Sequence, residues 1–412
     1  MSLEEHPKPQ ESTLQAERDG QPGWRRTLYV MWIAELICIV GFSFVMPFIP
    51  FYIRELGVTD ERLVPIWAGI LVTAPGLMFA VFSPIWGIVA DRYGRKLMVE
   101  RAMFGGAVLL ALMGTAKNVY QLLALRLVQG AITGTVAASI ALVSSVTPLS
   151  RLGYSLGLMQ TAVFAGNTVG PWLGGITADH YGYRIPFYIA GGLLFLGGWL
   201  VLVGARERFS RPSVEMVKAN GSLRDVANHR GFYAMLAIIF FVNLGGTIVA
   251  PIFPLFVESL VVLKTKVAST TGLVIAVSGL VAAVSAGVIG RISDRIGHKK
   301  VLVACTLFSG IFCIPQAIAQ SVGQLLGIRA LFGLAAGGTG PTVNALIGKI
   351  APRDSYGRAY GLATSVGAIG GAIGPLIGGL IASWLGLRPP FIIMGMALMI
   401  VSIIVALRVK ER

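Results

Sequence analysis

The chain has 412 residues; 55% are hydrophobic, 13% are charged, and the mean hydropathy is +0.75. A soluble protein of this length would carry roughly a quarter charged residues. The apolar residues form long uncharged runs rather than the alternating pattern of an outer-membrane barrel. The composition therefore excludes a soluble protein and predicts an all-α membrane protein.

Several apolar runs are long enough to cross a bilayer as a helix, which takes about 20 residues. We expect twelve membrane helices, at about 27–54, 64–90, 98–116, 118–146, 153–178, 185–205, 232–258, 267–291, 300–319, 321–348, 357–383 and 389–408. The polar residues 1–26 lack the apolar core of a signal peptide and are expected to form a disordered cytoplasmic tail. The basic segment 206–231 is expected to be a cytoplasmic linker between two six-helix halves, 27–205 and 232–412.

The net charge of +15 indicates membrane topology rather than nucleic-acid binding. With the N-terminus placed inside, most Lys and Arg residues fall on cytoplasmic segments, as the positive-inside rule requires. Both termini are therefore expected in the cytoplasm, and the chain is expected to be a multi-pass protein of the inner cell membrane.

The sequence shows no sign of a metal site, a disulfide framework or a cofactor. Its three cysteines, Cys38, Cys305 and Cys313, all lie in apolar helices, and its four histidines lie in loops or tails. There is no phosphate-binding loop of the type that holds ATP. We therefore expect no enzyme activity, and a monomer surrounded by membrane lipids.

The two halves are related by an internal repeat. Shifting the chain by 203 to 204 residues superposes Pro47 on Pro251, Gly87 on Gly290 and Gly170 on Gly374. Two parallel six-helix repeats that rock about a site at the membrane midplane form a transporter architecture. Residues that both halves share are expected to be architectural, whereas residues of one half alone are better candidates for chemistry.

Helix 27–54 contains Glu35, which lies roughly 13 Å into an apolar core about 30 Å thick. An ionisable residue inside a membrane helix is a functional-site hypothesis by default. The equivalent position in the second half is Ile239, so the fold does not require an acid there. We expect Glu35 to hold a proton or to meet a cationic ligand, with Arg126 at a similar depth. A structural partner for Arg126 is the alternative.

The loop after the second helix carries a recognisable motif. Residues 87–96 read GIVADRYGRK, and residues 290–299 repeat them as GRISDRIGHK. The motif resembles the loop signature of the major facilitator superfamily, which implies a conformational latch. In such a latch glycine permits close helix approach and aspartate faces the N-terminus of a neighbouring helix. The latch motif contains Gly87, Asp91, Arg92, Gly94, Arg95, Asp294 and Arg295.

Helix 118–146 contains the sequence RLVQG at residues 126–130, which resembles a signature of proton-coupled members of this superfamily. An arginine inside a membrane helix is unfavourable unless it faces water or a partner. The resemblance implies a role for Arg126 in proton coupling. The second half repeats this residue as Arg329, so a structural role is the alternative.

Helix 153–178 contains GNTVGPWLGG at residues 166–175, which resembles the antiporter signature of the superfamily. Its glycines give a face for close packing, and its proline bends the helix. The motif residues are Gly166, Gly170, Pro171, Gly174 and Gly175. An ordinary packing face is the alternative, because residues 370–379 repeat the pattern. Asn167 and Asn243 lack an equivalent in the other half and are companions of Glu35 in the expected site.

Residues 41–52 read GFSFVMPFIPFY and resemble twelve-helix drug:proton antiporters, a likeness that extends from Trp24 onward. In some relatives a helix 1 acid placed like Glu35 recognises cationic drugs. The resemblance implies export of lipophilic compounds, cations among them, in exchange for protons. Aromatic and methionine side chains of the first and seventh helices would suit varied apolar ligands. A proton-coupled transporter of a specific metabolite such as a sugar is the alternative. A membrane receptor or scaffold that transports nothing is the alternative from a different functional class.

Overall fold

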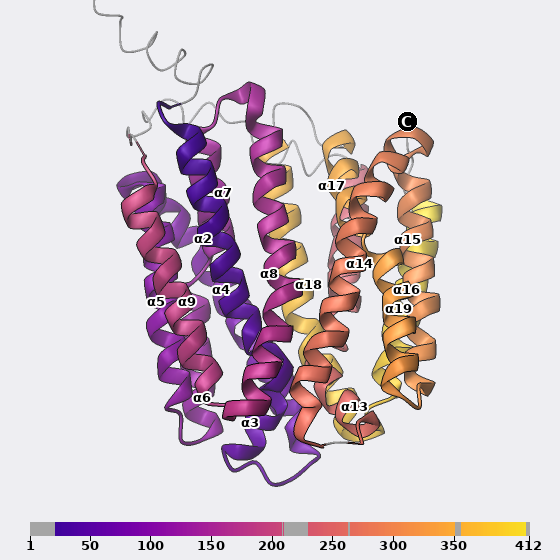
Figure 1. Ribbon diagram of the computed structural model, residues 1–412. Helices are drawn as coiled ribbons and strands as arrows, with labels where there is room; N and C mark the ends of the chain where they lie inside the picture. The colour runs from indigo at the N-terminus through magenta and orange to yellow at the C-terminus, as the bar shows by residue number, and fades with distance from the viewer. Residues whose placement is uncertain (1–20, 208, 210–229, 263, 351–355, 409–412) are drawn as a thin grey trace, which may run out of the picture.

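The computed structural model describes residues 21–207, 209, 230–262, 264–350 and 356–408 (Figure 1). Within these ranges every regular element is a helix and no strand occurs, so the predicted all-α class is confirmed. The expected tail and linker lie almost entirely outside the described residues. Nine of the described helical segments are long and apolar enough to cross a membrane.

The N-terminal bundle is the set of helices before residue 205. Its elements are α2 (Trp24–Phe44), η1 (Met46–Phe48), α3 (Ile49–Glu55), α4 (Leu63–Tyr93), α5 (Arg95–Gly114), α6 (Val119–Ile132), α7 (Thr135–Val146), η2 (Leu149–Arg151), α8 (Leu152–Tyr181) and α9 (Ile185–Gly204).

The C-terminal bundle is the set of helices after residue 229, and it stands beside the first (Figure 1). Its elements are α12 (Arg230–Thr247), α13 (Phe253–Leu260), η3 (Lys264–Lys266), α14 (Val267–Ile296), α15 (His298–Cys313), η4 (Ile314–Ile318), α16 (Val322–Ala336), α17 (Thr339–Ile350), α18 (Tyr356–Leu385) and α19 (Pro389–Arg408).

Four of the expected helices are interrupted rather than continuous. The first breaks between α2 and α3, beside Pro47 and Pro50, because proline lacks the N–H that a helix interior requires. The seventh breaks between α12 and α13, beside Pro251 and Pro254. The fourth breaks between α6 and α7 at Gly134, whose φ of 137° is a conformation that other residues rarely adopt. The tenth breaks between α16 and α17.

The antiporter-like motif packs α8 against α2. A Cβ atom added to Gly170 would meet Ser43 Oγ and would lie 2.7 Å from the carbonyl oxygen of Val40. Ser43 Oγ donates a hydrogen bond to the carbonyl oxygen of Gly166, at 3.0 Å. The second copy makes the same crossing, since Gly374 stands against Thr247 Oγ1 and the Leu244 carbonyl. Small residues therefore let α8 and α2, and α18 and α12, touch backbone to backbone.

The two bundles meet through repeat-related contacts. Gly69 of α4 stands against the Pro375 backbone of α18, and its equivalent, Gly272 of α14, stands against the Pro171 backbone of α8. The pair Gly76 with Ala372 is matched in the same way by Gly279 with Thr168. The repeat seen in the sequence thus shapes the contact between the bundles.

The bundles are joined at one end and separate at the other. The joined end, which carries α3 and α13, lies at the bottom of Figure 1. There Arg54 Nη1 donates to both carboxylate oxygens of Glu258, at 2.9 Å, and the Asp179 carboxylate of α8 accepts the backbone N–H groups of Ala268 and Ser269 at the start of α14, at 3.1 and 2.7 Å.

The opposite end carries the two copies of the latch motif and is open. A Cβ atom added to Gly87, Gly153, Gly287 or Gly290 would find no atom within 4 Å. The helices that line this end therefore do not touch across the bundles at these positions. We call it the latch end.

Candidate functional site

Two cavities lie in the interior, one against each bundle. The N-terminal cavity, of about 330 Å³, is lined by residues of α2, α4, α6 and α7. The C-terminal cavity, of about 680 Å³, is lined by residues of α12 and of α15 to α19, together with Gln160 of α8. Neither cavity has an acidic residue in its lining among the described residues.

The wall of the N-terminal cavity is largely apolar. Ile39, Phe42, Met46 and Phe79 contribute to it. The expected aromatic and methionine lining is therefore present in part. Other aromatic residues of the first and seventh helices are buried in the cores of the bundles instead; these are Phe44, Phe48 and Phe253.

Arg126 is the charged residue of the N-terminal cavity. Its side chain is 5% exposed, its Nη1 donates to Gln129 Oε1 at 3.2 Å, and its Nε has no hydrogen-bond partner among the described residues. A buried guanidinium with an unused donor is suited to a polar or anionic group that enters the cavity.

The repeat equivalent of Arg126 is held differently. The Arg329 guanidinium carbon lies 4.4 Å from the ring centroid of Phe253 and 5.2 Å from that of Phe332. Its Nη1 donates to Gln316 Oε1, at 3.1 Å. Arg329 is thus placed between aromatic rings and does not line either cavity, whereas Arg126 faces one.

Glu35 is fully buried between α2 and α7. Ser139 Oγ donates to its Oε2 at 2.6 Å, and its Oε1 has no partner among the described residues. The residue lines neither cavity. A carboxyl group with one unsatisfied oxygen in a dry place can be stabilised by a proton, a cation or incoming water.

The expectation that Glu35 and Arg126 share a depth is wrong in this structure. Glu35 contacts Ser139 of α7, which lies thirteen residues after Arg126 and beyond the break at Gly134 between α6 and α7. No ion pair joins Glu35 to Arg126 within the described part of the chain. Sequence positions alone did not give the register between α2 and the α6–α7 segment.

The wall of the C-terminal cavity is rich in uncharged polar side chains. It contains Gln160, Asn243, Thr306, Ser309, Thr339, Asn344 and Thr364. Asn243 Nδ2 donates to the Ile239 carbonyl at 2.8 Å, and Ser309 Oγ is buried without a partner among the described residues. Asn243 therefore lines the C-terminal cavity and is not brought together with Glu35, while Asn167 is exposed on α8 and lines neither cavity.

Among the described residues, no hydrogen bond or ion pair of the latch motif crosses between the bundles. Asp91, Arg92, Asp294 and Arg295 are exposed, and Arg92 stacks on its neighbour Tyr93. The carboxylate at the start of α5 is not Asp91 but Glu207, which accepts the backbone N–H groups of Arg95 and Lys96 at 3.1 and 2.8 Å. It also lies beside Gly94, whose φ is 100°.

Sequence reasoning missed the residues that join the closed end, Arg54, Glu258 and Asp179. A signal for the ion pair was present, because Arg54 and Glu258 are repeat equivalents, 204 positions apart, with opposite charges. No such signal in the sequence pointed to Asp179, because its contact with α14 depends on where the N-terminus of that helix lies in space.

Comparison with known proteins identifies the family to which this sequence and fold correspond. The family described as Major Facilitator Superfamily matches residues 31–265 and 235–412. The chain is 35% identical to the multidrug resistance protein MdtG of Escherichia fergusonii over 81% of this chain and 82% of that protein. It is 34% identical to the MdtG of Salmonella arizonae over 79% and 80%.

Solved structures share the fold at low sequence identity. A bacterial homologue of the human lysosomal transporter Spinster aligns with a TM-score of 0.79 at 14% identity, covering 94% of this chain and 97% of that one. A human organic anion transporter (TETRAN) aligns with a TM-score of 0.68 at 17% identity, covering 93% and 100%. With matching helices, repeat and motifs, the chain belongs to the Major Facilitator Superfamily.

Proposed function

We propose that this protein exports lipophilic compounds, cations among them, from the cytoplasm in exchange for protons. The chain is a membrane transporter and not an enzyme, as its family indicates. Its relatives at 34 to 35% identity are named multidrug resistance proteins. The observation that carries the proposal is a pair of bundles joined at one end and open at the other, with a cavity against each.

The proposed topology has twelve membrane helices in two six-helix halves, 27–205 and 232–412. The positive-inside rule places both termini and the latch end in the cytoplasm. The state described here is then open to the inside, and the end joined by Arg54 and Glu258 faces outward. Transport proceeds by opening this joined end and closing the latch end around the cavities.

The two cavities favour substrates with an apolar body and a few hydrogen-bonding groups. The N-terminal cavity offers aromatic and methionine side chains, which accept varied apolar shapes. The C-terminal cavity offers amides and hydroxyls. A transporter of a specific metabolite such as a sugar is the second candidate, because that polar wall could bind a polyol.

Glu35 is the proposed proton carrier. Arg126, which lines the N-terminal cavity, is proposed to take part in coupling proton binding to transport. Glu35 is the acid of α2, is fully buried and has no equivalent in the second half. Because it lies outside the cavities in this state, water or substrate reaches it only after the helices move. This separates proton binding from substrate binding in space. The protein is proposed to act as a monomer in the lipid bilayer.

The test is proton flux in proteoliposomes that contain the purified protein and a pH-sensitive dye. A lipophilic cation, a neutral lipophilic compound and a panel of sugars are added in turn under an imposed pH gradient. The proposal expects proton movement with the lipophilic compounds and none with sugars. Flux that only a sugar elicits would establish the second candidate instead.

A further inference from the structure

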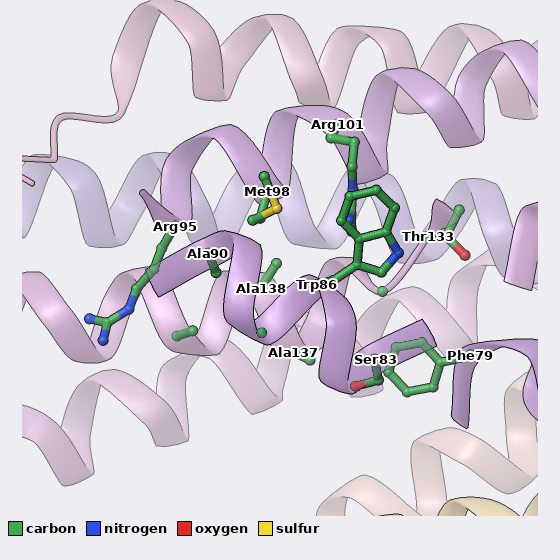
Figure 2. A pocket seen from close by; sticks show the side chains of 13 residues that line it. Phe79, Ser83, Trp86, Ala90, Arg95, Met98, Arg101, Thr133, Ala137 and Ala138 are labelled. Atoms are coloured by element: carbon green, nitrogen blue, oxygen red, sulfur yellow. The ribbon is translucent and has the colours of Figure 1, made fainter. Parts of the chain in front are cut away.

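A third cavity lies between α4, α5 and α7, outside the site described above (Figure 2). Its volume is about 130 Å³, and most of its wall is apolar, with Phe79, Met98 and Ala138 among the lining residues. It shares Phe79 and Gly134 with the N-terminal cavity, so the two spaces adjoin. We call it the Arg101 pocket.

Arg101 of α5 is the unusual residue of this pocket. Its guanidinium carbon lies 3.5 Å from the ring centroid of Trp86, and Figure 2 shows the two side chains stacked. The indole is fixed, because Trp86 Nε1 donates to the Ala131 carbonyl at 2.6 Å. Arg101 Nε and Nη1 are buried and have no acceptor among the described residues. The guanidinium is therefore held in place by stacking while its donors remain unused.

No acidic side chain of the surrounding helices neutralises Arg101 in the described part of the chain. Glu100 lies 3.6 Å from Lys96 on the same helix. Glu35 is bound by Ser139 of α7, and Glu207 caps the start of α5. Arg101 is half-buried, and its shielded Nε and Nη1 have no acceptor among the described residues, so a negative group that enters the pocket can accept from them.

The repeat shows that packing does not require this arrangement. At the shift of 203 residues, the positions equivalent to Trp86 and Arg101 are Ile289 and Ala304, and Gly338 precedes α17 as Gly134 precedes α7. A Cβ added to Gly338 would meet Ile289 Cγ2 and the Sγ of Cys305, which follows Ala304, so the C-terminal bundle fills this region with uncharged side chains. The N-terminal bundle has instead a cation, an indole and a cavity.

We propose that the Arg101 pocket binds the anionic head, phosphate or carboxylate, of an amphipathic molecule. Such heads accept two parallel hydrogen bonds from a guanidinium. Arg101 follows Arg95, the first residue of α5, by six positions, which places it about 9 Å from that helix end. The head then lies near the membrane surface, and the tail lies along Phe79 and Met98. The molecule that carries this head is either a membrane phospholipid or a free amphipathic anion.

The experiment measures binding to the purified full-length protein in a neutral maltoside detergent. The probes are phosphatidylglycerol, phosphatidylcholine, dodecanoate and inorganic phosphate, followed by native mass spectrometry and by the shift in melting temperature. Arg101→Met removes the charge and keeps the bulk. Arg151→Met is the matched control, because Arg151 is exposed in η2 and lines none of these cavities.

We expect Arg101→Met to weaken phosphatidylglycerol or dodecanoate binding about tenfold, the effect of losing a charge-assisted pair. Arg151→Met should bind like the parent, and Arg101→Lys should fall between. Binding of phosphatidylglycerol alone identifies a lipid site, whereas binding of dodecanoate as well identifies a site for free amphipathic anions. Equal binding by the parent and Arg101→Met, or binding of inorganic phosphate alone, overturns the proposal. Arg101→Gln supplies the same comparison if the methionine variant does not fold.

Discussion

Glu35 has one partnered and one unpartnered carboxylate oxygen in a place without solvent. This makes the residue sensitive to any group that reaches it when the helices move. The lone hydrogen bond comes from Ser139 of α7, which continues the helix that carries Arg126.

A Glu35→Gln variant keeps the shape of this side chain and removes its ability to exchange a proton. We expect it to lose the efflux of lipophilic cations while some efflux of neutral lipophilic compounds remains. Efflux of both classes is measured from cells that express equal amounts of the variant and the parent. Equal handling of both classes by the two proteins would contradict the proposed role.

Ser139→Ala is the matched control for that variant. It removes the hydrogen bond to Glu35 and leaves the carboxyl group in place. We expect it to retain cation efflux with an altered dependence on pH. If Ser139→Ala loses efflux as fully as Glu35→Gln does, the hydrogen bond rather than the proton is the essential feature.

Sequence alone selected Glu35 because a carboxyl group stands out in an uncharged run of residues. It did not place Glu35 relative to Arg126, since the register between two helices depends on packing along their whole length. Arg101 was missed for a related reason. It follows the basic residues at the start of α5 and reads as one more cytoplasmic charge until its stacking on Trp86 is seen.

At the scale of the helices, the crossing of α8 over α2 depends on the absence of side chains at Gly166, Gly170 and Gly174. A Cβ at each of these positions would meet backbone atoms or Ser43, and neither can move without separating the helices. The two copies of the motif make the same crossing, which explains why the sequence repeats it.

We expect Gly170→Leu to abolish export while the protein remains folded, because the helices must move apart to admit the side chain. Gly170→Ala should reduce export partially, as overpacking by one methyl group destabilises a contact by about 1 to 3 kcal/mol. The control is Gly192→Ala on α9, where a Cβ meets no atom within 4 Å. Drug efflux is measured at equal expression, and unchanged efflux in Gly170→Leu would refute the packing role.

Many of the helices were predictable, because nine of the described helical segments are long and apolar enough to cross a membrane. Their breaks were predictable only in part. Pro47 and Pro251 mark two of them, but the break before α7 depends on Gly134 taking a φ of 137°, a choice that Phe79 packing beside it reinforces. Glycines such as Gly130 stay within a regular helix, so a glycine in the sequence does not by itself predict a break.

At the scale of the whole molecule, two polar contacts between described residues cross between the bundles at the closed end. The Asp179 carboxylate at the start of α14 and the Arg54–Glu258 ion pair both cross between the bundles. The negative carboxylate is favoured there by the free N–H groups and dipole of the helix N-terminus. Their loss should make opening of this end easier.

We expect Asp179→Asn and Glu258→Gln each to shift the protein toward the state that is open at this end. Spin labels at Thr59 and Ser259, which are exposed there, report the change as longer distances between the labels. Glu61→Gln is the control, because Glu61 pairs with Arg54 within the N-terminal bundle and does not cross to the other. Unchanged distances in both crossing variants would show that apolar packing alone closes this end.

The exposed position of Asp91 predicts that it acts in the opposite state, when the latch end closes. Asp91→Asn should then favour the state open at the latch end and slow transport, with substrate binding intact because Asp91 lines neither main cavity. Asp294→Asn should show a weaker effect, since its copy of the motif differs at His298. Transport at the parent rate by Asp91→Asn would show that the latch assignment is wrong.

The Arg54–Glu258 pair has a consequence for the history of the chain. These residues are repeat equivalents, so in an assembly of two identical copies of one half the same residue would face itself at this position. Two arginines or two glutamates at this distance would repel each other. The attraction could therefore arise only after the two copies had separate coding sequences that could mutate independently. The closed end of the present protein is a product of that divergence, and two copies of either half could not rebuild it.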